Sequence, residues 1–172
     1  PRCLFCPVAR NCEALRLGIQ EELPKTAGKA PPTPVVEACA LVSDGGWVLV
    51  VRRAGPGLWS DFWEFPTIHR EGPDPAGRAF GVPVDLAEGV ERLTGVRIEV
   101  GGQVKSLTYG VTRYRVRLDA FAGHPVATGN QGTKPIPGPG MSEAAWVEAA
   151  KLSELTFSAA GRRVLAAVRS AP

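Results

Sequence analysis

Three of the four cysteines in this chain, Cys3, Cys6 and Cys12, lie within its first twelve residues. Thiolates bind soft metals and iron–sulfur clusters, and close spacing lets one short loop wrap around the metal. Two disulfides are a competing interpretation, but the fourth cysteine, Cys39, stands apart in the apolar run VVEACALV. Metal or cluster ligation in a reducing compartment therefore explains this spacing better than disulfides or idle thiols do.

The identity of the metal stays open on spacing alone. Zinc is an alternative to an iron–sulfur cluster, although zinc sites usually consist of two short cysteine pairs far apart in the sequence. Either site needs a fourth ligand. Cys39 follows a proline-rich stretch and has apolar neighbours, so we expect it in the hydrophobic core and not at the metal.

A second group with chemical potential is cationic. Between Lys105 and Leu118 the chain carries four cations and no acid. Arg113, Arg115 and Arg117 alternate with apolar residues, so a strand here would have one basic face. Such a face suits phosphate contact, but it is also typical of a solvated edge strand whose charges prevent aggregation. The residues alone do not choose between these two interpretations.

The length and composition indicate what kind of domain carries these groups. The chain has 172 residues, 44% of them apolar, which suits one ordinary domain with an appendage. The net charge of +3 favours a polyanionic partner only weakly. We find no run long enough to span a membrane and no signal peptide. The expectation is a monomeric cytoplasmic protein without a membrane partner, and the missing initial Met suggests a fragment or a processed chain.

The expected elements divide the chain into three parts. Residues 1–23 read as a cysteine loop with a short helix, and residues 24–34 hold four prolines and read as a linker. Residues 35–172 alternate between strand and helix patterns, which indicates an α+β domain. Strands are expected at 35–43, 47–53, 96–110, 111–123 and 143–150, and helices at 83–95 and 157–170. Asp85 and Ser158 are the expected N-caps of those helices.

Several stretches together resemble the adenine DNA glycosylases of the MutY type. PRCLFCPVARNCEA resembles the last three-quarters of their cluster loop, with Cys3, Cys6 and Cys12 at the second, third and fourth ligand positions. GLWSDFWEFP and the ending WVEAAKLSELTFSAAGRRVL resemble later motifs of that family. The resemblance implies an α+β fold with a Nudix-like mixed β-sheet flanked by helices. It also implies a [4Fe–4S] cluster whose first ligand lies outside this chain, so we expect the cluster to assemble poorly here.

The same resemblance implies a function. The chain would be the C-terminal portion of an A/G-specific adenine DNA glycosylase in base-excision repair, with no catalytic residue of its own. Its partner would be double-stranded DNA containing A·8-oxoguanine or A·G mispairs. The family's lesion-probing motif aligns with Val111, Thr112 and Arg113, and Arg115 and Arg10 are the expected phosphate contacts.

Two other functions remain as alternatives: a plain DNA-binding module, and a free-standing Nudix-like hydrolase of oxidised nucleotides. An active Nudix hydrolase holds magnesium through glutamates on a helix, in a pattern that ends REUxEExGU. Aligning Thr94–Val96 with the end of that pattern places Arg92 and Leu93 at the glutamate pair and Gly89 at the preceding glutamate. The remaining Glu88 and Glu91 are expected on a solvated helix face. Diphosphate hydrolysis is therefore disfavoured by the sequence.

Overall fold

The computed structural model describes residues 1–25, 30–56, 59–71, 83–126 and 134–168. It divides the chain into two compact units, Pro1–Pro31 and Pro32–Pro172. The boundary falls within the stretch predicted as a linker. In the described parts, no helix is both long enough and apolar enough to cross a membrane.

The first unit is built from short helical turns. It contains two 3₁₀ turns and one short α-helix: η1 (Cys3–Phe5), η2 (Ala9–Asn11) and α1 (Glu13–Leu17). None of the three buries a residue. The helix α1 ends at Gly18, whose φ of 72° is the left-handed conformation that favours glycine at a helix end.

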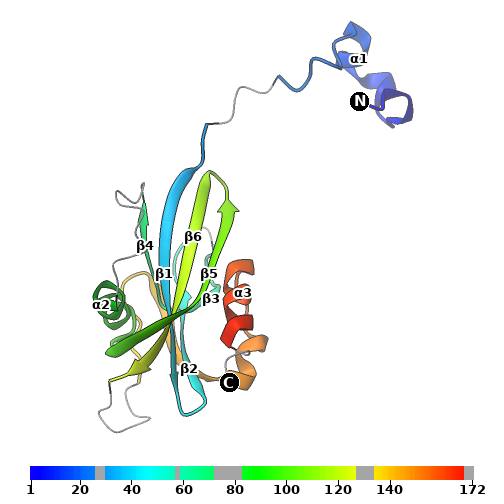
Figure 1. Cartoon of the computed structure of the whole chain (residues 1–172). Coiled ribbons are helices and arrows are strands. Elements are labelled where there is room, and N and C mark those ends of the chain that lie inside the picture. Colours follow the sequence, from blue (N-terminus) through cyan, green and yellow to red (C-terminus); the bar gives the residue numbers. More distant parts are fainter. Residues whose placement is uncertain (26–29, 57–58, 72–82, 127–133, 169–172) are drawn as a thin grey trace. The chain divides into compact units, whose positions relative to one another are not determined.

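The second unit is a mixed sheet with two α-helices (Figure 1). Its strands are β1 (Thr33–Asp44), β2 (Trp47–Arg53), β3 (Trp63–Glu64), β4 (Thr67–Glu71), β5 (Ile98–Val111), β6 (Tyr114–Pro125) and β7 (Met141–Glu148). Its helices are α2 (Pro83–Thr94), the 3₁₀ turn η3 (Ala149–Glu154) and α3 (Ala159–Val168). The strand order is β3-β2-β1-β6-β5, with β4 paired to β1 and β7 paired to β2.

The strand β1 lies at the centre of this sheet. It runs parallel to β6 and antiparallel to β4 and β2. Its apolar residues are buried on both faces, as is typical of a central strand. Ala40 and Val42 pack into one core cluster, and Cys39 and Leu41 pack into the other. The expected core position of Cys39 is thus confirmed.

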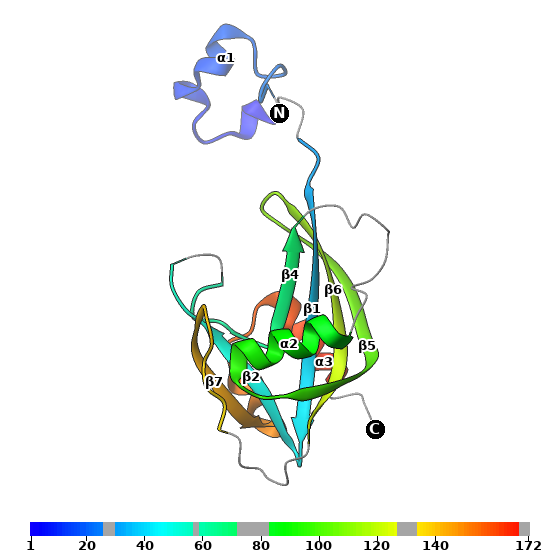
Figure 2. The same ribbon diagram turned by 90° about the vertical axis from the view of Figure 1, so that its left-hand side faces the viewer.

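The two α-helices cover opposite faces of the sheet (Figures 1 and 2). On one face, Leu86 and Val90 of α2 pack with the cluster that contains Val42. On the other face, Val164 and Leu165 of α3 pack with the cluster that contains Cys39. The prediction of an α+β fold, a mixed sheet flanked by helices, is therefore confirmed.

The helix ends agree with the sequence in part. The Ser158 hydroxyl accepts a 3.1 Å hydrogen bond from the Gly161 N–H, which confirms that residue as an N-cap. The expectation for Asp85 was wrong, because α2 begins at Pro83 and places Asp85 inside its first turn. A proline fits that first position since its missing N–H has no partner there anyway.

The C-terminal end of α2 is covered by the segment 134–140. The Ile136 N–H donates to the Thr94 carbonyl and the Gly138 N–H to the Leu93 carbonyl, each at 2.9 Å. These bonds satisfy carbonyls that a helix end leaves unpaired. The stretch 124–140 is rich in glycine and proline and has no periodicity, which predicts a mobile loop. Of that stretch, residues 127–133 lie outside the described residues, and 134–140 forms a wall against α2.

Candidate functional site

A cleft of about 520 Å³ opens where β2 ends, β4 begins and α2 terminates. Residues 139–141, at the end of the segment that covers α2, line another side of the cleft. Polar and charged side chains from several elements line it. They are Arg53 of β2, Ser60 of the β2–β3 connection, Thr67 and His69 of β4, and Arg92 of α2.

The charged groups among the described residues that line the cleft are cationic. Two guanidinium groups line it, and none of the described residues that line it carries a carboxylate. Arg92 is exposed, so its charge faces solvent and any ligand that enters. A concave surface of one charge sign concentrates ions of the opposite sign. The cleft is therefore suited to anions.

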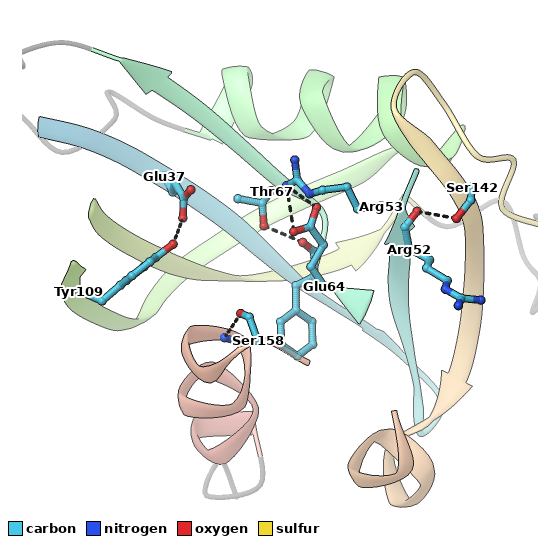
Figure 3. Close-up of polar contacts among 10 residues, drawn as sticks. Glu37, Arg52, Arg53, Glu64, Thr67, Tyr109, Ser142 and Ser158 are labelled. Atoms are coloured by element: carbon cyan, nitrogen blue, oxygen red, sulfur yellow. Dashed lines mark hydrogen bonds and ion pairs between the residues drawn. The ribbon is translucent and has the colours of Figure 1, made fainter. Parts of the chain in front are cut away.

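Arg53 is held at the cleft wall by an ion pair (Figure 3). Its Nη2 donates to both carboxylate oxygens of Glu64, at 2.8 and 3.0 Å. The Glu64 side chain is only 23% exposed. Burial raises the pKa of the Glu64 carboxyl above its ordinary range, and the charge of Arg53 opposes that rise. Burial is the larger of the two effects.

Further half-buried polar groups lie near this pair (Figure 3). The Tyr109 hydroxyl donates a 2.8 Å hydrogen bond to the Glu37 carboxylate. Burial, followed by the charge of Glu37, raises the pKa of Tyr109. The Thr67 hydroxyl donates to the Phe65 carbonyl at 2.6 Å. Two half-buried carboxylates, Glu37 and Glu64, thus lie close enough to interact electrostatically, and Glu64 contacts the arginine of the cleft.

The α2 positions at which an active Nudix hydrolase carries metal-binding glutamates hold other groups here. Arg92 and Leu93 line the cleft. Gly89 is buried, and a Cβ at its position would overlap the Ile68 side chain. Magnesium needs several oxygen ligands in tight geometry, whereas these residues offer a cation, an alkyl group and no side chain. The residues present do not fit a magnesium ion at this place.

The carboxylates that α2 does carry lie elsewhere. Glu88 and Glu91 line a separate open hollow together with Glu99 and Arg97. Within the described parts of the chain, no group of three or more His, Cys, Asp or Glu side chains is placed to hold a metal ion. The sequence expectation of solvated glutamates agrees with their exposure.

The three cysteines of the first unit are half-buried free thiols. The structure, which describes residues 1–25 of this unit, does not gather Cys3, Cys6 and Cys12 into a group that could hold a metal. Their role as ligands stays a prediction from spacing. Arg10 is exposed on the turn η2, and its expected phosphate contact is likewise a prediction.

The other predicted contacts gather at the tip of the β5–β6 hairpin. Val111 pairs with Tyr114, which leaves Thr112 and Arg113 as the turn. Thr112 takes a left-handed φ of 51°. Arg113 donates to the Tyr114 hydroxyl at 2.9 Å, and its guanidinium lies 5.0 Å from the ring centre. Together with the exposed Arg115, these residues form a cationic tip that does not line the cleft.

Sequence reasoning missed the cleft itself. No motif or spacing in the sequence marks Arg53 or His69 as a site residue. Both residues reach the cleft because β2 ends and β4 begins near the C-terminal end of α2. The available signal was weak: a basic residue at a strand end, and an arginine where a known signature has a glutamate.

Comparison with known proteins gives a family match for most of the chain. Residues 37–167 match the family model described as NUDIX domain. A solved MutT protein from Methanosarcina mazei Go1 is 19% identical with a TM-score of 0.61, covering 82% of this chain and 95% of that chain. A NUDIX hydrolase from Nitrosomonas europaea is 14% identical with a TM-score of 0.59, covering 82% and 90%. The NUDIX domain of Shewanella oneidensis NrtR complexed with ADP ribose is 17% identical with a TM-score of 0.55, covering 92% and 97%.

These matches correct the functional expectation drawn from the glycosylase resemblance. The family model is a NUDIX domain, and the structures named above are described as a MutT protein, a NUDIX hydrolase and a NUDIX domain. They point to a hydrolase family and give no support for an adenine DNA glycosylase, for base-excision repair or for an iron–sulfur protein. The predicted partner, DNA with A·8-oxoguanine or A·G mispairs, is corrected on the same ground.

Proposed function

Because the chain belongs to the NUDIX domain family, we propose that it binds a nucleoside phosphate in the cleft between Arg53 and Arg92. The observation that carries the proposal is the charge of this cleft, which has two guanidinium groups and no carboxylate among its described lining residues. Guanidinium groups donate paired hydrogen bonds that match the oxygens of a phosphate.

The size of the cleft supports a ligand of this class. A volume of about 520 Å³ lies within the range of small-molecule sites. Two solved structures with this fold are named for related ligands: the NrtR domain complexed with ADP ribose, and an ADP-ribose pyrophosphatase from Streptococcus suis, 14% identical with a TM-score of 0.54. ADP-ribose is therefore a suitable probe for the first experiment.

Binding, without metal-assisted hydrolysis, is the first candidate for what the cleft does. Arg92 stands at one position where the family signature places a carboxylate, so the phosphate would meet that arginine directly. Hydrolysis of a nucleoside diphosphate is a second candidate, which the family match and the names of the solved structures favour. Both candidates place the phosphates in the same cleft.

The test of the cleft is calorimetric titration with ADP-ribose. Arg92→Ala removes an exposed cation, and Arg53→Lys keeps the charge of Arg53 but removes its planar fork. Each should weaken binding by roughly tenfold or more, since one hydrogen bond to a charged group contributes about 1.5–3 kcal/mol. Arg115→Ala is the matched control, because this exposed arginine lies on the hairpin. Wild-type affinity in both cleft variants, or an equal loss in the control, would remove the basis for the proposal.

A second assay separates the two candidates. The wild-type chain is incubated with ADP-ribose and Mg²⁺, and the release of AMP is followed by chromatography. Binding without AMP release supports a binding domain. Mg²⁺-dependent release that Arg92→Ala abolishes supports the hydrolase candidate and shows that the metal is held by groups other than the glutamates of the family signature.

A further inference from the structure

The ion pair at the cleft wall uses only part of the Arg53 guanidinium. A guanidinium carries five N–H donors, and Glu64 accepts from one nitrogen alone, Nη2. The Nε atom is buried and has no hydrogen-bond partner among the described residues. The side chain as a whole is 35% exposed. Because Nε is enclosed by the protein, the donors that can meet a ligand are those of the exposed part of the guanidinium.

The backbone fixes the place of both partners. Glu64 pairs with Val51 in the β2–β3 ladder, and the Arg53 N–H donates to the Phe62 carbonyl at 3.2 Å. Arg53 lines the cleft, whereas Glu64 is not among the residues that do. Glu64 thus contacts the arginine from outside the set of groups that a ligand would touch (Figure 3).

We propose that Glu64 is a positioning residue for this cleft: it holds the Arg53 guanidinium at the wall, so that the remaining donors meet an oxyanion of the ligand. The inference rests on the proposed function, because it concerns the same cleft. Without Glu64, a flexible arginine would have to be ordered by the ligand, and that loss of freedom reduces affinity.

Charge repulsion alone predicts the opposite change in ligand affinity when Glu64 is removed. A carboxylate beside an anion site repels the ligand, so its removal should tighten binding if charge were all that mattered. Positioning predicts weaker binding after the same removal. The direction of the change therefore decides between the two effects.

The experiment compares three variants by titration with ADP-ribose. Glu64→Ala removes the charge and the contact, and should raise the dissociation constant roughly tenfold. Glu64→Gln keeps an oxygen that accepts from Nη2 and should fall between wild type and Glu64→Ala. Glu37→Gln is the matched control, because it removes a neighbouring half-buried carboxylate whose contact is with Tyr109. It should bind as tightly as wild type or slightly more tightly.

If Glu64→Ala does not fold, the affinity for ADP-ribose measured across a pH series tests the same role. The charged and titratable groups that act on Glu64 are Arg53, Glu37 and His69, so the series is run with His69→Asn to remove the imidazole. ADP-ribose has no terminal phosphate that titrates near neutral pH. As the pH falls and Glu64 takes up a proton, affinity should decline towards that of Glu64→Gln, which should stay level.

The outcomes separate this inference from the proposed function. If Arg53→Lys and Arg92→Ala bind like wild type, the proposed function is overturned, and the positioning role is overturned with it. If they weaken binding while a folded Glu64→Ala binds as tightly as wild type or more tightly, the positioning role alone is overturned. An affinity that does not decline with falling pH, or that declines equally in Glu64→Gln, overturns it as well. Folding of each variant is checked by circular dichroism.

Discussion

Gly89 of α2 rests directly on Ile68 of β4. A Cβ at Gly89 would overlap the Ile68 Cγ2 methyl and lie 3.6 Å from the Ile68 Cβ. Gly89 stands where the signature of an active Nudix hydrolase carries a glutamate. The helix therefore sits too close to the sheet for a longer side chain, and a packing contact occupies the place of a metal ligand.

The first prediction concerns this contact. Gly89→Ala should lower the free energy of unfolding by up to about 2 kcal/mol, measured by urea denaturation. Alanine gains about 1 kcal/mol in helix propensity over glycine, but overpacking a core contact costs about 1–3 kcal/mol. The β-branched Ile68 side chain is stiff and cannot swing aside easily.

The control for this prediction is the same substitution in an Ile68→Ala background. Removing the methyl groups of Ile68 makes room for a Cβ, so Gly89→Ala should then stabilise the protein. The two effects form a double-mutant cycle with a clear interaction energy. Stabilisation by Gly89→Ala in the parent chain would show that the contact is not tight.

A second prediction concerns the wall of the cleft. A Cβ at Gly138 would overlap the Arg92 carbonyl oxygen and lie 2.9 Å from the Leu93 Cα. Both are backbone atoms of α2, so the segment 134–140 would have to move. Gly138→Ala should lower stability by about 1–2 kcal/mol, because its bond to the Leu93 carbonyl is lost, and should weaken ADP-ribose binding.

Gly102→Ala is the matched control for that variant. A Cβ there would meet no atom within 4 Å, so stability should change by less than about 0.5 kcal/mol. If Gly138→Ala behaves like Gly102→Ala in both assays, the wall is not held against α2 in the way the structure shows.

The sequence predicted the periodic elements well. The 3.6-residue spacing of Leu86, Val90 and Leu93 indicated the buried side of α2, and all three are buried. The alternation along β6 predicts that Tyr114, Val116, Leu118 and Ala120 share one face; the last three are buried and Tyr114 is half-buried. The short strands β3 and β4 were missed, because their aromatic-rich stretch has no clear period. Two aromatic residues of that stretch belong to the core: Phe65 is 2% exposed, and Trp63 packs against the same cluster.

The cleft was beyond the reach of the sequence for a topological reason. Arg53 and Arg92 come from a strand end and a helix end that only the complete sheet brings to one place. The basic face expected on β6 is also smaller than alternation suggested. Arg117 pairs with the buried carboxylate of Asp119 at 2.8 Å, and that carboxylate also accepts from Ser106 at 2.6 Å. A local period cannot show such a pairing.

A third prediction uses the contrast among the cysteines. Burial, together with the nearby Glu37 carboxylate, raises the pKa of the Cys39 thiol, which is 2% exposed. Since only the thiolate reacts, Cys39 should resist iodoacetamide in the native protein and react after denaturation. The half-buried Cys3, Cys6 and Cys12 should react before denaturation. Mass spectrometry of labelled peptides gives the order, and labelling of Cys39 at the rate of the other three would contradict the prediction.

The fourth prediction concerns the dependence of stability on pH. Burial raises the pKa of Glu64 above its ordinary value of 4.5, so the unfolded chain releases this proton at a lower pH than the folded chain does. Unfolding therefore releases a proton between these two pKa values, and stability falls as the pH rises through that window. Relative to Glu64→Gln, the wild type should be most stable below pH 4.5 and lose that advantage as the pH rises through the folded pKa. Urea denaturation of both proteins across this range measures the difference, and a difference that grows in favour of wild type with rising pH would mean that the charge of Arg53 outweighs burial.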